Sequence, residues 1–242
     1  RHGTIQKYAH SKFKLILNQN KKSFAYIESR NKYLDNEIKK YKFESNLIKV
    51  KKINPKNFEK KINNPYFKNI NNLNNLSFIL ELGKKIKLNK NTIFKAVNFF
   101  KGLDFRQQII LSNKKITIIN DSKSTSFSSS LNLLKSYQNI FWIVGGLAKK
   151  GDRLNLPKKY YKNINCYIYG RDKNFFIKIF KKKLKFQVFK RLDEIIKKIK
   201  IDIKNKNRAN IIFSPAAASF DQFLNFEHRG KYFNYLIRKS NF

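Results

Sequence analysis

Three short polar segments could bind a ligand with phosphate or carboxylate groups, and each follows an apolar run typical of a buried strand. The segment Asn120-Asp-Ser-Lys-Ser-Thr125 supplies a carboxylate, an ammonium group and hydroxyls. Gly145-Gly-Leu-Ala-Lys149 places a lysine after two glycines, which allow close backbone approach. The third, Ser214-Pro-Ala-Ala-Ala-Ser219, leads into a helical pattern, whose free backbone N–H groups attract anions. Together these residue types indicate recognition of an anionic substrate.

Each segment also has an ordinary structural explanation. The first could be a polar strand–helix loop with a capping serine, and the second a Gly-Gly turn with a lysine nearby in a very basic chain. The third could be a capped helix after a core strand, with Ser219 where the helix would begin and Asp221 in its first turn. The residue types alone leave both explanations open.

The elements around these segments must position them. From about residue 105 onward, apolar runs alternate with helical patterns, which is typical of an α/β fold with a mostly parallel sheet covered on both faces. In open sheets of this kind, ligands bind beyond the carboxyl ends of the strands. We expect strands at Lys115–Asn120, Ile140–Val144, Asn165–Tyr169, Phe186–Phe189 and Ala209–Phe213. We expect helices at Ser126–Tyr137, Lys173–Leu184, Leu192–Ile199 and Phe220–Arg238.

Residues 1–102 show a different pattern, and Gly102 marks a boundary between two expected domains, 1–102 and 103–242. A strand is expected at Ser23–Ile27. The stretch Lys39–Asn69 is rich in lysine and asparagine without clean periodicity, which is typical of loops and irregular strands. Helical patterns cover Ile5–Asn18, Asn71–Ile86 and Asn91–Phe100.

The charge of the chain could indicate nucleic-acid binding. Its 54 lysines and arginines exceed its 15 acidic residues, which gives a formal net charge of +39. The lysines, however, are spread over every segment instead of forming one block. Lysine, asparagine, isoleucine and phenylalanine are abundant together, as AT-rich codons would encode. We therefore interpret the charge as coding bias on solvated faces, which would still attract phosphate-bearing substrates.

The cysteine and methionine content and the length of the apolar segments narrow the class of protein further. Cys166 is the one cysteine, which excludes an internal disulfide or a cysteine metal cluster. No segment has the roughly 20 consecutive apolar residues that span a bilayer, so we expect a cytoplasmic protein without membrane insertion. The sequence contains no methionine and therefore no initiator, so we expect a chain whose N-terminal part is missing.

Residues 213–230 closely resemble the C-terminal signature of the Mur ligase family, Ser-Pro-Ala-x-Ala-Ser-x-Asp-Gln-Phe-x-x-Phe-Glu-x-Arg-Gly, in the form found in members that add D-glutamate. The resemblance implies an ATP-dependent ligase that joins D-glutamate to UDP-N-acetylmuramoyl-L-alanine through an acyl phosphate in peptidoglycan synthesis, with ATP and Mg²⁺ as cofactors. It implies a Rossmann-like domain at 103–242 that binds D-glutamate and part of ATP. It also implies the remainder of a P-loop-type α/β ATPase domain at 1–102. The full-length enzyme would be a cytoplasmic monomer that does not bind nucleic acid.

The resemblance assigns roles to residues at matching positions. It implies D-glutamate binding by Thr125, Lys149, Ser219, Phe220 and Phe226. It implies ATP binding by Asn72, Asn75, Arg106, Asp121 and Lys123. Within this set, Asn75 would contact adenine, Asp121 the ribose or another part of the nucleotide, and Lys123 the phosphates. Lys12, in Gln6-Lys-Tyr8-x-x-x-Lys12, matches a lysine that is carbamylated by carbon dioxide, and a carbamate can ligate Mg²⁺. The implied catalytic residues are Lys12 and Lys123.

Several positions depart from the family pattern. Phe105 and Asn71 stand where the family has histidine, and Glu28-Ser-Arg-Asn31 stands where it has an Asn-x-Asp-Asp run. The phosphate-binding Gly-x-x-x-x-Gly-Lys-Ser/Thr loop is absent from the sequence, so we expect the chain itself to be inactive. Two alternatives remain open. One is another amino-acid ligase of the superfamily, similar to folylpolyglutamate synthase, and the other is a non-enzymatic basic module that binds nucleic acid.

Overall fold

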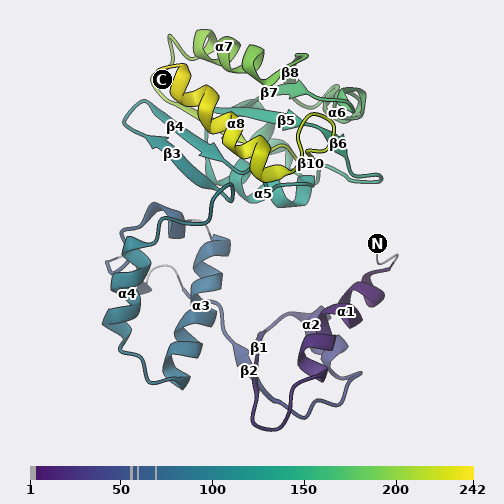
Figure 1. Ribbon diagram of the computed structural model, residues 1–242, viewed down its shortest axis with the longest axis vertical. Helices are drawn as coiled ribbons and strands as arrows, with labels where there is room; N and C mark the ends of the chain where they lie inside the picture. The colour runs from purple at the N-terminus through teal and green to yellow at the C-terminus, as the bar shows by residue number, and fades with distance from the viewer. Residues whose placement is uncertain (1–3, 55–56, 59, 69) are drawn as a thin grey trace. The chain divides into compact units, whose positions relative to one another are not determined.

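The chain divides between Phe100 and Lys101 into two units (Figure 1). The computed structural model describes residues 4–54, 57–58, 60–68 and 70–242.

The first unit contains a short parallel strand pair and a separate helical cluster. Its helices are α1 (Ile5–Leu17), α2 (Lys32–Ile38), α3 (Ile70–Lys85) and α4 (Lys90–Phe99), with a 3-10 turn, η2 (Pro65–Lys68). Strands β1 (Phe24–Glu28) and β2 (Asn46–Val50) pair in parallel. Side chains of Thr4, Asn31 and Asn89 accept backbone N–H groups at the starts of α1, α2 and α4, which satisfies donors that a helix N-terminus leaves free.

The second unit is built on a six-stranded sheet of order β3-β4-β9-β5-β7-β8. Its strands are β3 (Gln108–Ser112), β4 (Ile116–Asn120), β5 (Ile140–Gly145), β7 (Ile164–Tyr169), β8 (Lys185–Val188) and β9 (Ala209–Phe213). All neighbours pair in parallel except β3, which is antiparallel to β4. The helices are α5 (Phe127–Ser136), α6 (Lys173–Phe180), α7 (Leu192–Asp202) and α8 (Phe226–Lys239), with a 3-10 turn, η3 (Lys158–Asn163).

Helices cover both faces of this sheet (Figure 1). On one face, α5 and α6 pack through Leu134 and Phe180 against Trp142 of β5. On the other face, α7 and α8 pack against the alternate residues of the same strands, among them Phe213, whose ring stacks on Phe233 at 4.3 Å between centroids. Strands buried on both faces read as continuous apolar runs, which is why the sequence identified them.

The predicted α/β fold with a mostly parallel sheet is confirmed. The five predicted strands of the second unit occur within about one residue of their expected bounds. The sequence did not predict β3 or α2, and β2 lies inside Lys39–Asn69, where loops and irregular strands were expected. The helix expected at Phe220–Arg238 begins six residues later, at Phe226, because Asn225 and not Ser219 caps it: the Asn225 side chain accepts the backbone N–H of His228.

The strand order brings three loops to one place. Strand β9 lies between β4 and β5, so the segments that follow these three strands leave the sheet side by side at its carboxyl edge. The helix after β4, α5, covers one face, whereas α7, which precedes β9, covers the other. A position where connections diverge to opposite faces is where open α/β sheets hold their ligands.

Candidate functional site

A two-residue antiparallel ladder joins two of the three polar segments. Strand β6 (Leu147–Ala148) follows β5, and β10 (Ala217–Ala218) follows β9; Ala217 pairs with Ala148, and Ala218 with Leu147. The ladder fixes the backbone on either side of it, so that Lys149 and Ser219 each lie one residue beyond a paired position. Because the pairing is antiparallel, Lys149 and Ser219 flank opposite ends of the ladder, which joins two segments more than sixty positions apart in the sequence.

The segment after β4 is anchored by a buried network of hydroxyls. Ser214 Oγ donates to Asp121 Oδ2 at 2.8 Å and lies 2.7 Å from Ser130 Oγ, which in turn lies 2.8 Å from Ser124 Oγ. The indole N–H of Trp142 donates to the Ser214 carbonyl at 2.8 Å. The network ties the ends of β4 and β9 to α5, so the loop that carries Lys123 and its neighbours is held on several sides.

Asp121, expected to contact the nucleotide, is buried at 6% exposure. Its two carboxylate oxygens accept from Ser214 Oγ and from the backbone N–H of Gln107, at 2.8 and 3.2 Å. Burial raises the pKa of this carboxyl to about 7, against the opposing effects of both hydrogen bonds and of the Arg106 charge. In this structure, Asp121 therefore braces the loop, and its oxygens are already engaged.

The other residues expected to contact nucleotide or D-glutamate in this loop are exposed. The Lys123 ammonium lies 4.4 Å from the centre of the Phe226 ring, which is a cation–π arrangement. Thr125 is exposed directly before α5. Arg106 is also exposed, in a turn where Phe105 and Gln107 both have positive φ. The loop thus presents cations and a hydroxyl to solvent while its backbone is held below.

A cationic cavity of about 390 Å³ lies beside the ladder, between the loops that follow β5 and β7. Lys149, Lys150 and Arg171 line it together with Asp172. The Asp172 carboxylate accepts the backbone N–H of Ala148 at 2.9 Å, so this acidic group is used to hold the wall of the cavity. Three cations beside one engaged carboxylate leave an environment suited to a carboxylate ligand.

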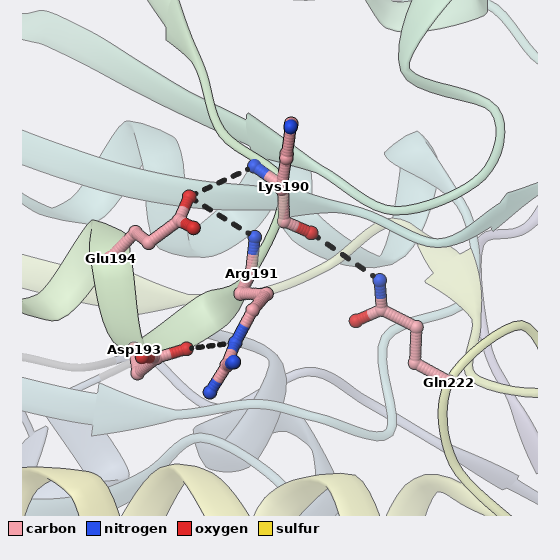
Figure 2. Close-up of polar contacts among 5 residues, drawn as sticks. All are labelled: Lys190, Arg191, Asp193, Glu194 and Gln222. Atoms are coloured by element: carbon pink, nitrogen blue, oxygen red, sulfur yellow. Dashed lines mark hydrogen bonds and ion pairs between the residues drawn. The ribbon is translucent and has the colours of Figure 1, made fainter.

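The signature turn, residues 219–225, connects β10 to α8. Ser219 is buried, and its carbonyl accepts the N–H groups of Gln222 and Phe223. Asp221 does not lie in a helical first turn as expected; its carboxylate accepts the backbone N–H of Arg171 at 3.0 Å. Figure 2 shows that Gln222 donates to the carbonyl of Lys190, in the loop after β8.

The loop after β8 is itself braced by helix α7, as Figure 2 also shows. The Glu194 carboxylate accepts the backbone N–H groups of Lys190 and Arg191, and Asp193 pairs with the Arg191 guanidinium at 2.8 Å. Glu194 thereby satisfies backbone donors at the start of α7, while Asp193 holds the Arg191 side chain. The signature turn consequently rests on neighbouring loops through Asp221 and Gln222, which are structural contacts that its sequence alone did not reveal.

Two aromatic residues of the signature differ in their solvent exposure and in their contacts. Phe220 is 68% exposed, at the start of the turn. Phe226 is half-buried at the start of α8; its carbonyl accepts from Ser122 Oγ at 2.8 Å, and its ring faces Lys123. Phe226 therefore joins the signature to the loop after β4, whereas Phe220 is available to a ligand.

In the first unit, Asn72 and Asn75 line a largely apolar cavity of about 430 Å³ formed by η2, α3 and α4. Aromatic and aliphatic side chains, among them Tyr66, Phe67 and Phe100, form its other walls. Asn72 is buried, and its amide donates to the Tyr66 carbonyl at 2.8 Å, whereas Asn75 is exposed. A flat apolar ring could enter this cavity and meet the free amide of Asn75.

Lys12 is an exposed residue of α1, and its ammonium lies 5.5 Å from the centre of the Tyr8 ring. Within the described residues, no group of three or more histidine, cysteine, aspartate or glutamate side chains could hold a metal ion. In the same part of the chain, no helix is long and apolar enough to cross a membrane.

Sequence reasoning missed two residues that shape the site. Asp152, after the β5 loop, accepts the backbone N–H of Phe127 at 2.7 Å and so occupies the start of α5. Arg229, a named position of the signature near the start of α8, is completely buried. No sequence signal distinguishes Asp152 from other surface carboxylates, but a fixed arginine within an otherwise apolar helix face could have been recognised as a buried cation.

Comparison with known proteins identifies relatives of one kind. The chain is 31% identical over 169 residues to a UDP-N-acetylmuramoylalanine–D-glutamate ligase of Wolbachia sp. subsp. Brugia malayi, a match that covers 69% of this chain and 34% of the relative. Ligases of the same name from Rickettsia felis and Hydrogenobaculum sp. are 31% and 33% identical, over 78% and 74% of this chain and 42% and 43% of the relatives. The chain thus spans roughly a third to two fifths of the length of these relatives. No protein-family model matches it.

The fold has a solved counterpart. The crystal structure of a murein peptide ligase from Psychrobacter arcticus aligns with 96% of this chain and 54% of its own, with a TM-score of 0.56 and 13% sequence identity. At this identity the likeness shows the fold. The sequence relatives and the signature at residues 213–230 show that the chain belongs to the Mur ligase family.

Proposed function

We propose that this chain is the C-terminal part of an ATP-dependent ligase that adds D-glutamate to UDP-N-acetylmuramoyl-L-alanine in the cytoplasmic steps of peptidoglycan synthesis. The observation that carries the proposal is the β6–β10 ladder, which pairs the segments that carry Lys149 and Ser219 at the carboxyl edge of the sheet, with the two residues at its opposite ends. The names of the sequence relatives support the same activity. In this proposal the second unit binds D-glutamate and the first unit contributes to the ATP site.

The proposed reaction has two steps. The carboxylate of UDP-N-acetylmuramoyl-L-alanine first takes the terminal phosphoryl group of ATP, which gives an acyl phosphate and ADP. The amine of D-glutamate then attacks the acyl carbon; a C–N bond forms, a tetrahedral intermediate collapses, and inorganic phosphate leaves. Catalysis of this kind depends mainly on positioning and on neutralising charge.

The residues of the second unit have distinct roles in this proposal. Lys149 pairs with one carboxylate of D-glutamate in the cationic cavity, while Ser219 and Thr125 hold the other end of the amino acid, with Phe220 and Phe226 as its apolar neighbours. Lys123 faces phosphate and Arg106 assists it, since both cations are exposed. Asp121 acts through the loop that it braces.

In the first unit, we propose that the cavity beside Asn75 receives adenine, with Asn72 fixing its wall. A carbamylated Lys12 would act only where further metal ligands are supplied, because the described residues do not complete a Mg²⁺ site. The sequence contains no Gly-x-x-x-x-Gly-Lys-Ser/Thr loop, so we expect this chain alone not to turn over ATP. Ligand binding is therefore the appropriate assay.

The test measures binding of D-glutamate to the 242-residue chain by amide chemical-shift titration. We expect saturable shifts at 146–149 and 217–222, with weaker binding of L-glutamate. Lys149→Ala removes a charged hydrogen bond worth about 1.5–3 kcal/mol, so its Kd should rise roughly 10- to 100-fold. Lys150→Ala is the matched control, since both lysines line the cavity but only Lys149 adjoins the ladder.

Four results would contradict the proposal. Equal affinity for the two enantiomers would remove the D-glutamate assignment, and an equal effect of Lys149→Ala and Lys150→Ala would remove the role of Lys149. Tight, steeply salt-dependent binding of arbitrary DNA without any response to D-glutamate would favour a nucleic-acid-binding module instead. A saturable response to a different amino acid would favour another ligase of the superfamily.

A further inference from the structure

Arg229 is a completely buried cation at the centre of the candidate site. It belongs to the second turn of α8, and its side chain is covered by the surrounding loops, with an exposed fraction of 0%. Charged side chains are almost never fully buried unless other groups satisfy them. A buried guanidinium therefore raises the question of what its donors hold.

The guanidinium joins two of the polar segments. Its Nε donates to Ser122 Oγ at 3.1 Å, and its Nη2 donates to the carbonyls of Ser122 and Ala217 at 2.7 and 3.0 Å. Ser122 Oγ donates in turn to the Phe226 carbonyl of the same helix. One side chain thus holds the loop that carries Lys123 and the strand that leads to Ser219.

A third segment lies against the remaining nitrogen. A Cβ atom added to Gly146 would lie 3.3 Å from Arg229 Nη1 and 2.4 Å from the Ala218 carbonyl, so Gly146 is packed directly on both. Nη1 is buried and has no hydrogen-bond partner. The segment that carries Lys149 is therefore held by close packing at this point, where only glycine fits.

We infer that Arg229 is a positioning residue that holds the three ligand-carrying loops in register, so that the affinity of the site for D-glutamate depends on a side chain that does not touch the ligand. This inference rests on the proposed function. The planar guanidinium suits the task because its donors diverge in a fixed geometry toward separate segments, which the single ammonium of a lysine cannot reproduce. Loss of the guanidinium should loosen the three loops together, while the sheet beneath them stays intact.

A general role in stability makes a different prediction. If Arg229 only strengthened the fold, its replacement would loosen the whole second unit, and D-glutamate affinity would change only as the population of folded protein changes. The hydrogen bonds predict a local effect instead, because they reach the segments 122–125 and 217–219 but no central position of β5 or β7. Amide exchange resolves these two cases residue by residue.

The experiment compares the wild-type 242-residue chain with Arg229→Lys, and uses Arg238→Lys as a matched control on the exposed side of the same helix. We expect Arg229→Lys to speed amide exchange at least tenfold in 121–125, 146–149 and 217–222, with exchange in β5 and β7 within twofold of wild type. We expect the Kd for D-glutamate to rise at least tenfold under the same conditions. Arg238→Lys should match wild type in both measurements.

Uniform acceleration of exchange through β5 and β7, or an unchanged Kd, would overturn the inference. If Arg229→Lys does not fold, Ser122→Ala replaces it, because this change removes one partner of the guanidinium and leaves the charge in place. It should loosen the same three segments to a smaller extent, and an effect confined to residue 122 and its neighbours would overturn the inference. If wild-type protein does not bind D-glutamate, the proposed function fails, and the exchange data alone still decide whether Arg229 couples the loops.

Discussion

Replacing Asp121 with asparagine should change how the stability of the second unit depends on pH. The buried carboxyl has a pKa of about 7 in the folded protein, because burial disfavours its charged form. In the unfolded chain its pKa should be about 3.9. At a pH between these two pKa values, the Asp121 carboxyl is protonated in the folded state and ionised in the unfolded state.

The sign follows from this difference. A carboxyl whose pKa is raised on folding stabilises the protein below the unfolded value, and this stability is lost as pH rises through the folded value. A shift of roughly three pKa units corresponds to about 4 kcal/mol in total, of which roughly 2–3 kcal/mol is lost between pH 5 and pH 8. Asp121→Asn cannot titrate, so its free energy of unfolding should lack this decrease.

The assay is urea denaturation followed by fluorescence, because Trp142 is the one tryptophan of the chain and is buried in the second unit. Its indole also donates to Ser214, the residue whose hydroxyl holds Asp121. The measured quantity is the difference in unfolding free energy between wild type and Asp121→Asn at pH 5 and pH 8. The control is Asp104→Asn, because the Asp104 carboxylate is exposed. Parallel pH profiles for wild type and Asp121→Asn would refute the reasoning.

Three further predictions test the framework of the site. Gly145→Ala should cost more than about 4 kcal/mol, because φ is +138° and the new Cβ would lie 1.9 Å from the Tyr169 carbonyl oxygen. Gly151→Ala, at φ +76° in open space, should cost only about 1–2 kcal/mol; equal losses in urea denaturation would contradict this difference. Burial raises the pKa of the Cys166 thiol, so a water-soluble thiol reagent should label it only on unfolding, and rapid labelling of native protein would contradict its position in the core. Residues 101–242 contain two cores of their own, so they should unfold cooperatively as an isolated fragment; a broad, non-cooperative transition would oppose this.

Local sequence was sufficient to identify the five parallel strands of the second unit, β4, β5, β7, β8 and β9, but not β3. Ile140–Val144 is apolar at every position and Ala209–Phe213 at every position except Asn210, a pattern typical of strands buried on both faces of a sheet. The polar segments that follow them were visible for the same reason, since each interrupts an apolar run. The signature at residues 213–230 then indicated the family, which periodicity could not.

Local sequence was not sufficient where two signals competed. Ser219 and Asn225 are both suitable helix caps, and the sequence favoured the first, whereas the chain uses the second. The reason lies in distant contacts: Asp221 accepts from Arg171, and Gln222 donates to Lys190, so the intervening residues form a turn. Such contacts join residues that are far apart in the sequence and leave no local pattern.

By itself, the sequence determined which residues form the parallel strands of the second unit, which loops are polar and which family the chain belongs to. Tertiary structure decided that β9 lies between β4 and β5, that β6 pairs with β10, and that Asp121 and Arg229 are buried. Strand order depends on how helices from distant segments cover the two faces, and burial depends on what packs above a residue. Strand order and burial both depend on many contacts between separate parts of the chain, and these contacts form only when the chain folds.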